Sequence, residues 1–432
     1  MIEPCRIIGV LDDGTEGLTA KVLSHLRRAD LVIGASRTLG LVAGHLGDGA
    51  RTRELMGNLA GLPDRMREAR ARGERVVVLA TGDPLCHGIA GFLRTQLDAE
   101  EYEVLPNLSL IQLTCARLGL PWQEMKICSV HDRDAGEWHQ SAGPDHGLYP
   151  ILRALARHDL VGVFTSADNS PSRIARMLVT AGLTGQFRPA VAERLLHRDE
   201  RLVTNCTLEE AAARRFADPN VLILRRVAPP ARKVLFGLND RSFRQRRPGK
   251  GLITKREVRA VSLARMQLRA DSIVWDIGAG SGALGLEAAC IASAGYVYAI
   301  EKNPNDLDIV AWNRRALGVT NHTLVPGKAP AGLETWPDPD AVFIGGSGKA
   351  LSELIALGLE RLRSGGNLVL NLVTAENLAV ATAALTQQGA TWDLTQIQVS
   401  RSRPILDMHR LAAENPVWIL CAGKPEHGKT AR

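Results

Sequence analysis

The chain has 432 residues, of which 45% are hydrophobic and 23% are charged, and this composition excludes a disordered or fibrous protein. Lysine and arginine outnumber aspartate and glutamate by 53 to 46, giving a formal charge of +7, so an anionic partner is favoured over a cationic one. The length exceeds one ordinary core and predicts two to four domains of about 100 to 200 residues each.

The first half of the chain alternates short apolar runs with amphipathic segments. Strands that are apolar on both faces and separated by helical patterns predict a parallel α/β architecture. The runs that we interpret as buried strands are residues 6–11, 30–35, 75–81, 102–106, 126–130, 160–166 and 220–227.

The pattern breaks at residues 229–250, where proline and glycine punctuate a stretch rich in arginine and lysine. We interpret this stretch as a linker between two modules, residues 1–228 and 251–432. The basic run from Arg241 to Arg259 has two interpretations that the sequence leaves open: a surface by which an anionic ligand enters, or a solvated linker.

The second half starts the α/β pattern again. Its predicted strands are residues 272–278, 296–303, 322–329, 340–346 and 366–373. With the helices between them, these strands make a complete doubly wound, Rossmann-like sheet. The two halves show no similarity to each other, so we expect two unrelated domains.

A glycine-rich turn follows the first strand of this second half. In the stretch "VWDIGAGSGALGLEAA", Gly278, Gly280 and Gly282 follow an apolar run and precede a helical pattern. Residues without a Cβ allow the backbone to turn sharply and approach a ligand closely, so the stretch predicts a nucleotide site. A tight turn without a ligand is the structural alternative.

Two nucleotides fit this turn. Gly278, Gly280 and Ala283 satisfy the G-x-G-x-x-A form of the NAD fingerprint, with Glu301 at the end of the next strand for the ribose. The same geometry serves S-adenosylmethionine, since Glu301 can accept from both ribose hydroxyls. The tighter spacing of three glycines, with Asp276 just upstream, favours the methyl donor, although Asp276 could instead cap the turn.

A second glycine-rich stretch, "VFIGGSGKA", lacks the Ser or Thr that a phosphate loop needs after its lysine, because Ala350 follows Lys349. We therefore reject ATP. The strand also does not end in the Asn/Asp-Pro-Pro-Tyr pattern of enzymes that methylate base amines, so methylation at carbon is favoured.

The cysteines and the N-terminus bear on the compartment. Seven cysteines include no C-x-x-C pair, which predicts neither a metal site nor a disulfide framework and fits buried thiols in a reducing cytoplasm. No stretch reaches the roughly 18 apolar residues of a spanning helix, and the N-terminus lacks a signal-peptide pattern. The chain is expected to be cytoplasmic.

At this point two family resemblances become visible. The C-terminal half, residues 236–422, resembles the CbiT-type decarboxylating methyltransferases of corrin biosynthesis, most specifically at residues 254–259 and in the Gly345-Gly346-Ser347-Gly348 loop. The N-terminal half is similar to the tetrapyrrole methylase family, in its CbiE-type branch. It carries the Gly82-Asp83-Pro84 motif and the Ser-x-His-x-Arg signature at residues 129–133.

The first module departs from its family in two places. The opening Gly-x-Gly-Pro-Gly turn of the family is Gly-Val-Leu-Asp-Asp-Gly here, at residues 9–14. The Pro-Gly-x-Ser-Ser loop is Pro-Asn-Leu-Ser-Leu, at residues 106–110. Asn107 can still serve that turn, because asparagine tolerates a left-handed backbone better than most residues.

The resemblances imply a fold and an activity. The fold is a tetrapyrrole methylase fold of two α/β subdomains fused to a Rossmann-like class I methyltransferase domain. The activity is methylation of an anionic precorrin at C5 by the first module and at C15 by the second, with decarboxylation of the C12 acetate, in cobalamin biosynthesis. Two S-adenosylmethionine sites, no metal and a homo-oligomer are expected.

The resemblances also imply site residues. The macrocycle and its acetate are assigned to His131, Arg133, Arg259, Arg401 and Arg403; exposed arginines on a solvated surface are the plain alternative. Donor binding in the first module is assigned to Gly82, Asp83 and Ser109. In the second module it is assigned to Thr254, Asp276, Gly278, Ala279, Gly280, Ser281, Gly282, Glu301, Lys328 and Ala329.

Three rival functions stay open. A nucleic-acid methyltransferase fits the positive charge but predicts aromatics among the cations for base stacking, and the basic run offers only Phe236 and Phe243. An NAD-dependent dehydrogenase and a ligand-binding module without catalysis are the others.

Overall fold

The structure is a computed structural model that describes residues 3–55, 59–131, 133–140, 142–228, 234–246, 253–346 and 348–424. The chain divides into two compact units. The first comprises residues 1–136, 158–176 and 187–227, and the second comprises residues 137–157, 177–186 and 228–432. The predicted linker at 229–250 lies partly outside the described residues, so its boundaries stay a prediction.

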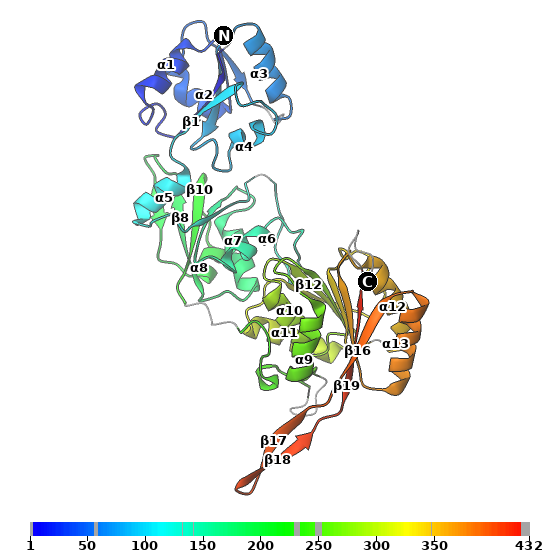
Figure 1. Ribbon diagram of the computed structural model, residues 1–432. Coiled ribbons are helices and arrows are strands. Elements are labelled where there is room, and N and C mark those ends of the chain that lie inside the picture. Colours follow the sequence, from blue (N-terminus) through cyan, green and yellow to red (C-terminus); the bar gives the residue numbers. More distant parts are fainter. Residues whose placement is uncertain are drawn as a thin grey trace. The chain divides into compact units, whose positions relative to one another are not determined.

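The first unit begins with a five-stranded parallel sheet in the order β3-β2-β4-β1-β5 (Figure 1). Apolar side chains cover both of its faces in two clusters, as expected for a buried parallel sheet. Its strands are β1 Cys5–Val10, β2 Leu31–Gly34, β3 Arg51–Glu54, β4 Val76–Thr81 and β5 Tyr102–Leu105. Its helices are α1 Ala20–Arg28, α2 Ser36–Val42, η1 Ala43–His45, α3 Leu62–Ala71 and α4 Ile89–Leu93.

A second sheet follows, in the order β6-β7-β10-β8-β9. Its strands are β6 Lys126–Ser129, β7 Leu160–Phe164, β8 Phe187–Glu193, β9 Arg201–Val203 and β10 Asn220–Arg226. The helices in this part of the chain are α5 Leu110–Leu118, α6 Tyr149–Leu155, α7 Pro171–Thr180 and α8 Leu208–Ala213.

The prediction of parallel pairing is wrong for this second sheet. Only β6 and β7 run parallel, whereas β7 with β10, β10 with β8 and β8 with β9 are antiparallel. A strand covered on both faces is apolar in either direction, so its sequence does not reveal the direction of its neighbours.

The second unit contains a seven-stranded sheet in the order β13-β12-β11-β14-β15-β19-β16. The first five of these strands are parallel, and β19 runs antiparallel to both of its neighbours. The strands are β11 Ile273–Ile277, β12 Tyr296–Glu301, β13 His322–Pro326, β14 Ala341–Ile344, β15 Asn367–Leu372, β16 Thr391–Ile397 and β19 Val417–Gly423.

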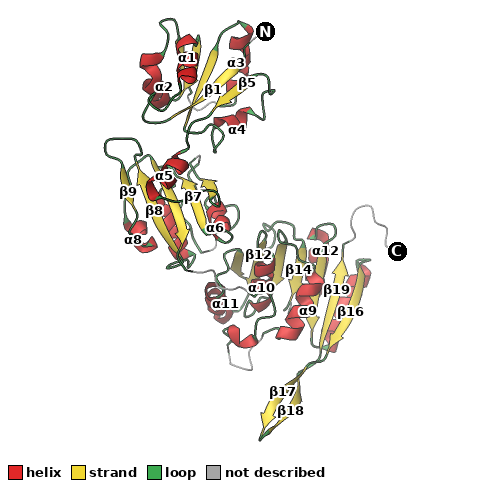
Figure 2. Cartoon of the chain, turned by 60° about the vertical axis from the view of Figure 1, so that its left-hand side comes forward, coloured by secondary structure: helices red, strands yellow, loops and turns green. Residues whose placement is uncertain are grey.

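Helices cover both faces of this sheet (Figures 1 and 2). One face packs against α9 Arg256–Met266, α10 Ala283–Ile291 and α11 Pro304–Ala316, and the other against α12 Leu351–Arg361 and α13 Ala375–Gln387. A short η2 turn, Asp240–Ser242, precedes α9. This three-layer arrangement confirms the predicted Rossmann-like class of the second half.

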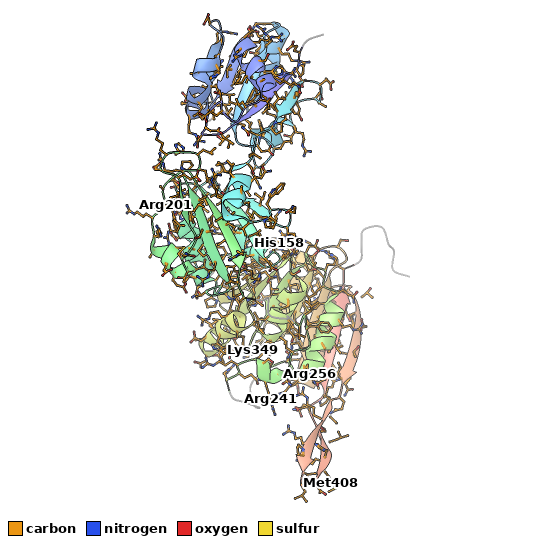
Figure 3. All side chains as sticks on the ribbon, turned by 90° about the vertical axis from the view of Figure 1, so that its left-hand side faces the viewer. His158, Arg201, Arg241, Arg256, Lys349 and Met408 are labelled. Atoms are coloured by element: carbon orange, nitrogen blue, oxygen red, sulfur yellow. The ribbon has the colours of Figure 1, made fainter. Side chains whose placement is uncertain are left out.

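A two-stranded hairpin extends from the second unit (Figure 2). It consists of β17 Ser400–Ile405 and β18 Met408–Ala413, with Met408 at its far end (Figure 3). The sequence interpretation included no strand in this region. Of the helices that the structure describes, none has the length and apolar character needed to cross a membrane.

Candidate active site

The glycine-rich turn after β11 has the conformation that its composition predicts. Gly278, Gly280 and Gly282 all adopt positive φ angles, of 78°, 55° and 74°. A Cβ at Gly278 would lie 2.5 Å from the carbonyl oxygen of Gly346, in the loop after β14. The backbones of the two glycine-rich loops therefore approach each other more closely than any other residue type permits.

The turn borders a cavity of about 470 Å³ at the carboxyl ends of β11, β12, β14 and β15, where open α/β sheets bind their ligands. Every donor-binding residue predicted for the second module lines it except Gly282, which is the N-cap of α10. The predicted lining residues are Thr254, Asp276, Gly278, Ala279, Gly280, Ser281, Glu301, Lys328 and Ala329. Gly345, Gly346 and Gly348 also line it, while Ser347 lies outside the described residues.

Glu301 ends β12 with its carboxylate fixed by two backbone amides. Oε2 accepts from the amide of Gly280 at 2.8 Å and Oε1 accepts from the amide of Asn303 at 2.8 Å. The side chain is buried but borders the cavity. Each oxygen retains a lone pair, so the carboxylate can accept from the two hydroxyls of a ribose.

Asp276 is the most unusual group of this cavity. It is 1% exposed, and neither carboxylate oxygen is paired with a side chain of the described residues. Burial raises the pKa of Asp276 to about 7; the nearby Gly285 amide lowers it, and the Glu301 carboxylate raises it further. A buried carboxylate without a partner is costly, so this position fits a ligand that brings a cation or a donor.

Among the residues that the structure describes, four cationic side chains line the same cavity: Arg246, Lys255, Lys302 and Lys328. The sequence interpretation named only Lys328 as a donor contact, and placed Arg246 and Lys255 in the basic run without a role. Arg246 is held by Asp306, whose two carboxylate oxygens accept from Nε and Nη2 at 2.7 Å each. Arg246 and Lys255 of the basic run therefore face the cavity. Their position supports the interpretation of this run as a surface for an anionic ligand.

Arg259 does not line the cavity. Its side chain is 0% exposed, and Nε lies 3.0 Å from Glu287, which is also 0% exposed. Nη1 contacts Asp240 at 3.1 Å and donates to the carbonyl of Thr254 at 2.6 Å. Because its guanidinium is committed to these partners, we correct the predicted catalytic role of Arg259 to a structural one.

Arg401 and Arg403 also lie outside the cavity lining. Arg401, at the base of the hairpin, contacts Asp240 at 3.0 Å and pairs with Glu257. Arg403 is 62% exposed in its side chain and lies 4.0 Å from Glu414. The structure therefore gives Arg401 an anchoring role for the hairpin and leaves Arg403 on the surface, in agreement with the plain alternative.

In the first unit, three backbone segments meet at the carboxyl ends of β1 and β4. A Cβ at Gly9 would lie 2.0 Å from the carbonyl oxygen of Gly82 and 2.9 Å from the amide nitrogen of Asn107. Gly82 itself has a φ of 66°. This crowding explains glycine at both positions and brings the Gly-Asp-Pro motif beside the loop that precedes α5.

The side chains of this region stabilise its turns. Asp83 accepts from the amide of Leu85 at 2.9 Å. Ser109 is 3% exposed and forms a capping box with Gln112 at the start of α5. In this structure both side chains are used within the turns, and the role of Gly82, Asp83 and Ser109 in donor binding stays a prediction.

Asp12, in the Asp-Asp-Gly turn, joins both sheets of the first unit. Its Oδ2 lies 3.1 Å from Nε2 of His197 and 3.2 Å from Nη1 of Arg37. The sequence interpretation noted the turn but gave Asp12 and His197 no role. No periodicity or spacing in the sequence connects residues so far apart in the chain.

His131 and Arg133 are exposed and lie in the loop after β6. His131 Nδ1 is hydrogen-bonded to the hydroxyl of Ser129, the first residue of the same signature. The loop is held by Asn169, which is 0% exposed and donates to the carbonyls of Val130 at 2.7 Å and Arg133 at 2.6 Å. Asn169 also accepts from the amide of Ala135 at 3.0 Å.

The Rossmann-like sheet, its glycine cradle and the Glu301 carboxylate at the cavity define the second unit as a nucleotide-binding domain, the class to which methyltransferases that use S-adenosylmethionine belong. Comparison with known families agrees. Residues 248–424 match the family described as "Precorrin methyltransferase domain", and residues 5–212 match "Tetrapyrrole (Corrin/Porphyrin) Methylases".

One relative matches nearly the whole chain, and two others match part of it. A Sinorhizobium precorrin-6Y C(5,15)-methyltransferase [decarboxylating] is 34% identical over 92% of this chain and 91% of its own. A Salmonella typhimurium cobalt-precorrin-6B C(15)-methyltransferase (decarboxylating) is 37% identical over 40% of this chain and 91% of its own. A solved precorrin-6y C5,15-methyltransferase structure from Geobacter metallireducens is 38% identical, with a TM-score of 0.43, and covers 44% of this chain and 100% of its own. The chain belongs to the decarboxylating precorrin-6Y C5,15-methyltransferases.

Proposed function

We propose that this chain converts precorrin-6Y to precorrin-8 with two molecules of S-adenosylmethionine, by methylating C5 and C15 and decarboxylating the C12 acetate. The observation that carries this proposal is the presence of two glycine-built cradles, one at Gly9 and Gly82 and one at Gly278 and Gly346, in a chain with a full-length relative of this activity. The nucleic-acid and dehydrogenase alternatives have no comparable support.

In the second unit, Asp276 and Glu301 hold the donor. The ammonium of its amino acid moiety supplies the cation that the unpaired Asp276 carboxylate lacks, and its ribose hydroxyls donate to Glu301. When bound, S-adenosylmethionine supplies an electrophilic methyl group. The protein therefore has chiefly to align donor and ring carbon, a task of positioning rather than of acid–base chemistry.

The cations of the cavity bind the carboxylates that the substrate keeps. Lys255, Lys302 and Lys328 line the cavity, and Arg246 is oriented there by Asp306. Charge-assisted hydrogen bonds to carboxylates are about twice as strong as neutral ones. These four side chains thus fix the macrocycle over the donor and account for the preference for an anionic tetrapyrrole.

In the first unit, the Gly82 turn holds the second donor through its backbone, and His131 and Arg133 face the macrocycle. Asn169 is a positioning residue for that loop, because it holds the carbonyls on both sides of His131.

The proposed compartment is the cytoplasm, where the seven free cysteines would stay reduced. A homo-oligomer is also proposed, supported by the exposed Leu406, Met408 and Leu411 of the hairpin.

The test is the mass of the product made from precorrin-6Y and S-adenosylmethionine by the full chain. The expected product has gained two methyl groups and lost one carbon dioxide. An E301A variant should neither decarboxylate nor methylate C15. A wild-type product with one added methyl group and its acetate intact would contradict the proposal, and so would E301A product identical to that of the wild type.

A further inference from the structure

Asn371 breaks the apolar pattern of β15 at its carboxyl end. On the face of β15 that packs against α9, Val369 belongs to the buried core, and Asn371 is the next residue on the same face. An amide in such a strand is costly unless it has partners. Asn371 lines the cavity. A ligand in the cavity could therefore form the hydrogen bonds that the apolar core cannot offer to its amide.

The two polar atoms of this amide differ in their contacts: among the described residues, Oδ1 has a hydrogen-bond partner and Nδ2 has none. Ser262 of α9 is 0% exposed, and its hydroxyl lies 3.0 Å from Oδ1 of Asn371 and 2.8 Å from the carbonyl of Val258, so its single proton is shared between these two acceptors. Nδ2 is buried and has no partner among the residues that the structure describes. With Oδ1 fixed by Ser262, the two N–H groups of Nδ2 remain available for an acceptor.

The position of β15 in the sheet places Asn371 away from the donor subsite. β14 lies between β15 and β11, whose turn holds the glycine cradle. Neighbouring strands lie about 4.8 Å apart, so β11 and β15 are separated by roughly 10 Å. We therefore assign Asn371 to the part of the cavity that would take the methyl acceptor, where its Nδ2 would donate to an acceptor atom of the substrate.

The surroundings of Asn371 select one kind of carboxylate. Val258, Val373 and Val417 line the cavity from α9, from the residue after β15 and from β19. Among the described cations of the cavity, Lys255 is the N-cap of α9, whereas Arg246, Lys302 and Lys328 lie outside α9, β15 and β19. A cation beside a carboxylate stabilises its charge and opposes its conversion to neutral carbon dioxide. A neutral amide in apolar surroundings orients the group without that opposition.

We propose that Asn371 binds, through Nδ2, the substrate carboxylate that leaves as carbon dioxide. This inference rests on the proposed function and replaces the arginines that the sequence suggested for this acetate. In the reaction, the bond between the acetate methylene and its carboxylate breaks. The electron pair passes into the conjugated macrocycle, and the methylene carbon takes up a proton from solvent to become a methyl group.

Two nearly isosteric variants of the full chain test this proposal. N371L removes both donors, and we expect carbon dioxide release to fall at least about tenfold, because the carboxylate loses the group that orients it for cleavage. N371D should fall further, because its carboxylate repels that of the substrate. S262A should lie between N371L and the wild type, because Asn371 keeps its donors but loses the hydroxyl that orients them.

The matched control is N367A, since Asn367 lies on the same face at the opposite end of the same strand. It should leave carbon dioxide release unchanged. Calorimetric titration with S-adenosylhomocysteine should give wild-type affinity for N371L and N371D, which separates an effect on the carboxylate from damage to the fold.

Wild-type carbon dioxide release by N371L, or release by N371D equal to or above that of N371L, would overturn the inference. The second result would mean that the amide accepts a hydrogen bond from the substrate. If the wild-type chain releases no carbon dioxide from precorrin-6Y, the proposed function fails instead.

Discussion

Replacing Asp276 by asparagine should stabilise the ligand-free protein at neutral pH and weaken donor binding. Burial raises the pKa of Asp276 from 3.8 to about 7. Between these pH values the folded state binds more protons than the unfolded state, so the free energy of unfolding falls as the pH rises. At about 1.36 kcal/mol for each tenfold change in proton affinity, the full loss is on the order of 4 kcal/mol.

The amide in D276N cannot ionise, so the free energy of unfolding of this variant does not fall with pH at this position. The free energy of unfolding of D276N relative to the wild type should therefore grow by about 2–3 kcal/mol between pH 5 and pH 8. Urea titrations followed by tryptophan fluorescence measure it, because Trp275 lies beside Asp276 in β11 and of the seven tryptophans only Trp122 belongs to the first unit.

The same substitution should weaken S-adenosylhomocysteine binding to the second unit at least tenfold, since the ammonium of the ligand loses its counter-ion. D340N is the control, because the Asp340 carboxylate already accepts from the amide of Ile273 and from Arg269. It should not stabilise the protein. The reasoning would be refuted if the free energy of unfolding depended on pH equally in D276N and the wild type, or if the two bound the ligand with the same affinity.

Three further predictions follow from the geometry. R259M should lower the free energy of unfolding by about 3–5 kcal/mol in urea titrations, because it leaves Glu287 buried without a counter-ion. A R259M/E287Q double variant should recover part of the loss, since glutamine needs no counter-ion and its oxygen can still accept from a backbone amide that Glu287 binds; a further loss would argue against the pair. G278A should weaken S-adenosylhomocysteine binding to the second unit at least tenfold, since its Cβ would collide with Gly346. The calorimetric control is G91A in α4, where a Cβ meets nothing within 4 Å, and it should bind normally. N169D should lower C5 methylation at least tenfold, because its carboxylate cannot donate to the two carbonyls of the His131 loop. S-adenosylhomocysteine binding to the second unit should persist. Equal rates for N169D and wild type in a product mass assay would exclude this positioning role.

The sequence predicted those features that depend on local chemistry. The glycines of the β11 turn are required by their positive φ angles, and Glu301 follows at the end of the next strand, so spacing alone located the core of the cavity lining. The central parallel strands were predictable for the same reason, because a short apolar run between helical segments has few other interpretations.

Features that depend on contacts between distant segments were not predictable. Asn371 acquires its meaning only because Ser262 lies opposite it on α9, and Arg259 is structural only because Glu287 is buried beside it. The direction of β8 and β10 and the hairpin at Ser400–Ala413 also went unrecognised, since neither carries a distinctive pattern in the sequence.

The central claim is that one chain holds two methyl-donor sites of different construction. Isothermal titration of the full chain with S-adenosylhomocysteine tests it most directly. The wild type should bind two molecules per chain, and E301A, which lacks the ribose-facing carboxylate of the second unit, should bind one. A wild-type stoichiometry of one, or an E301A stoichiometry of two with unchanged affinities, would contradict the account.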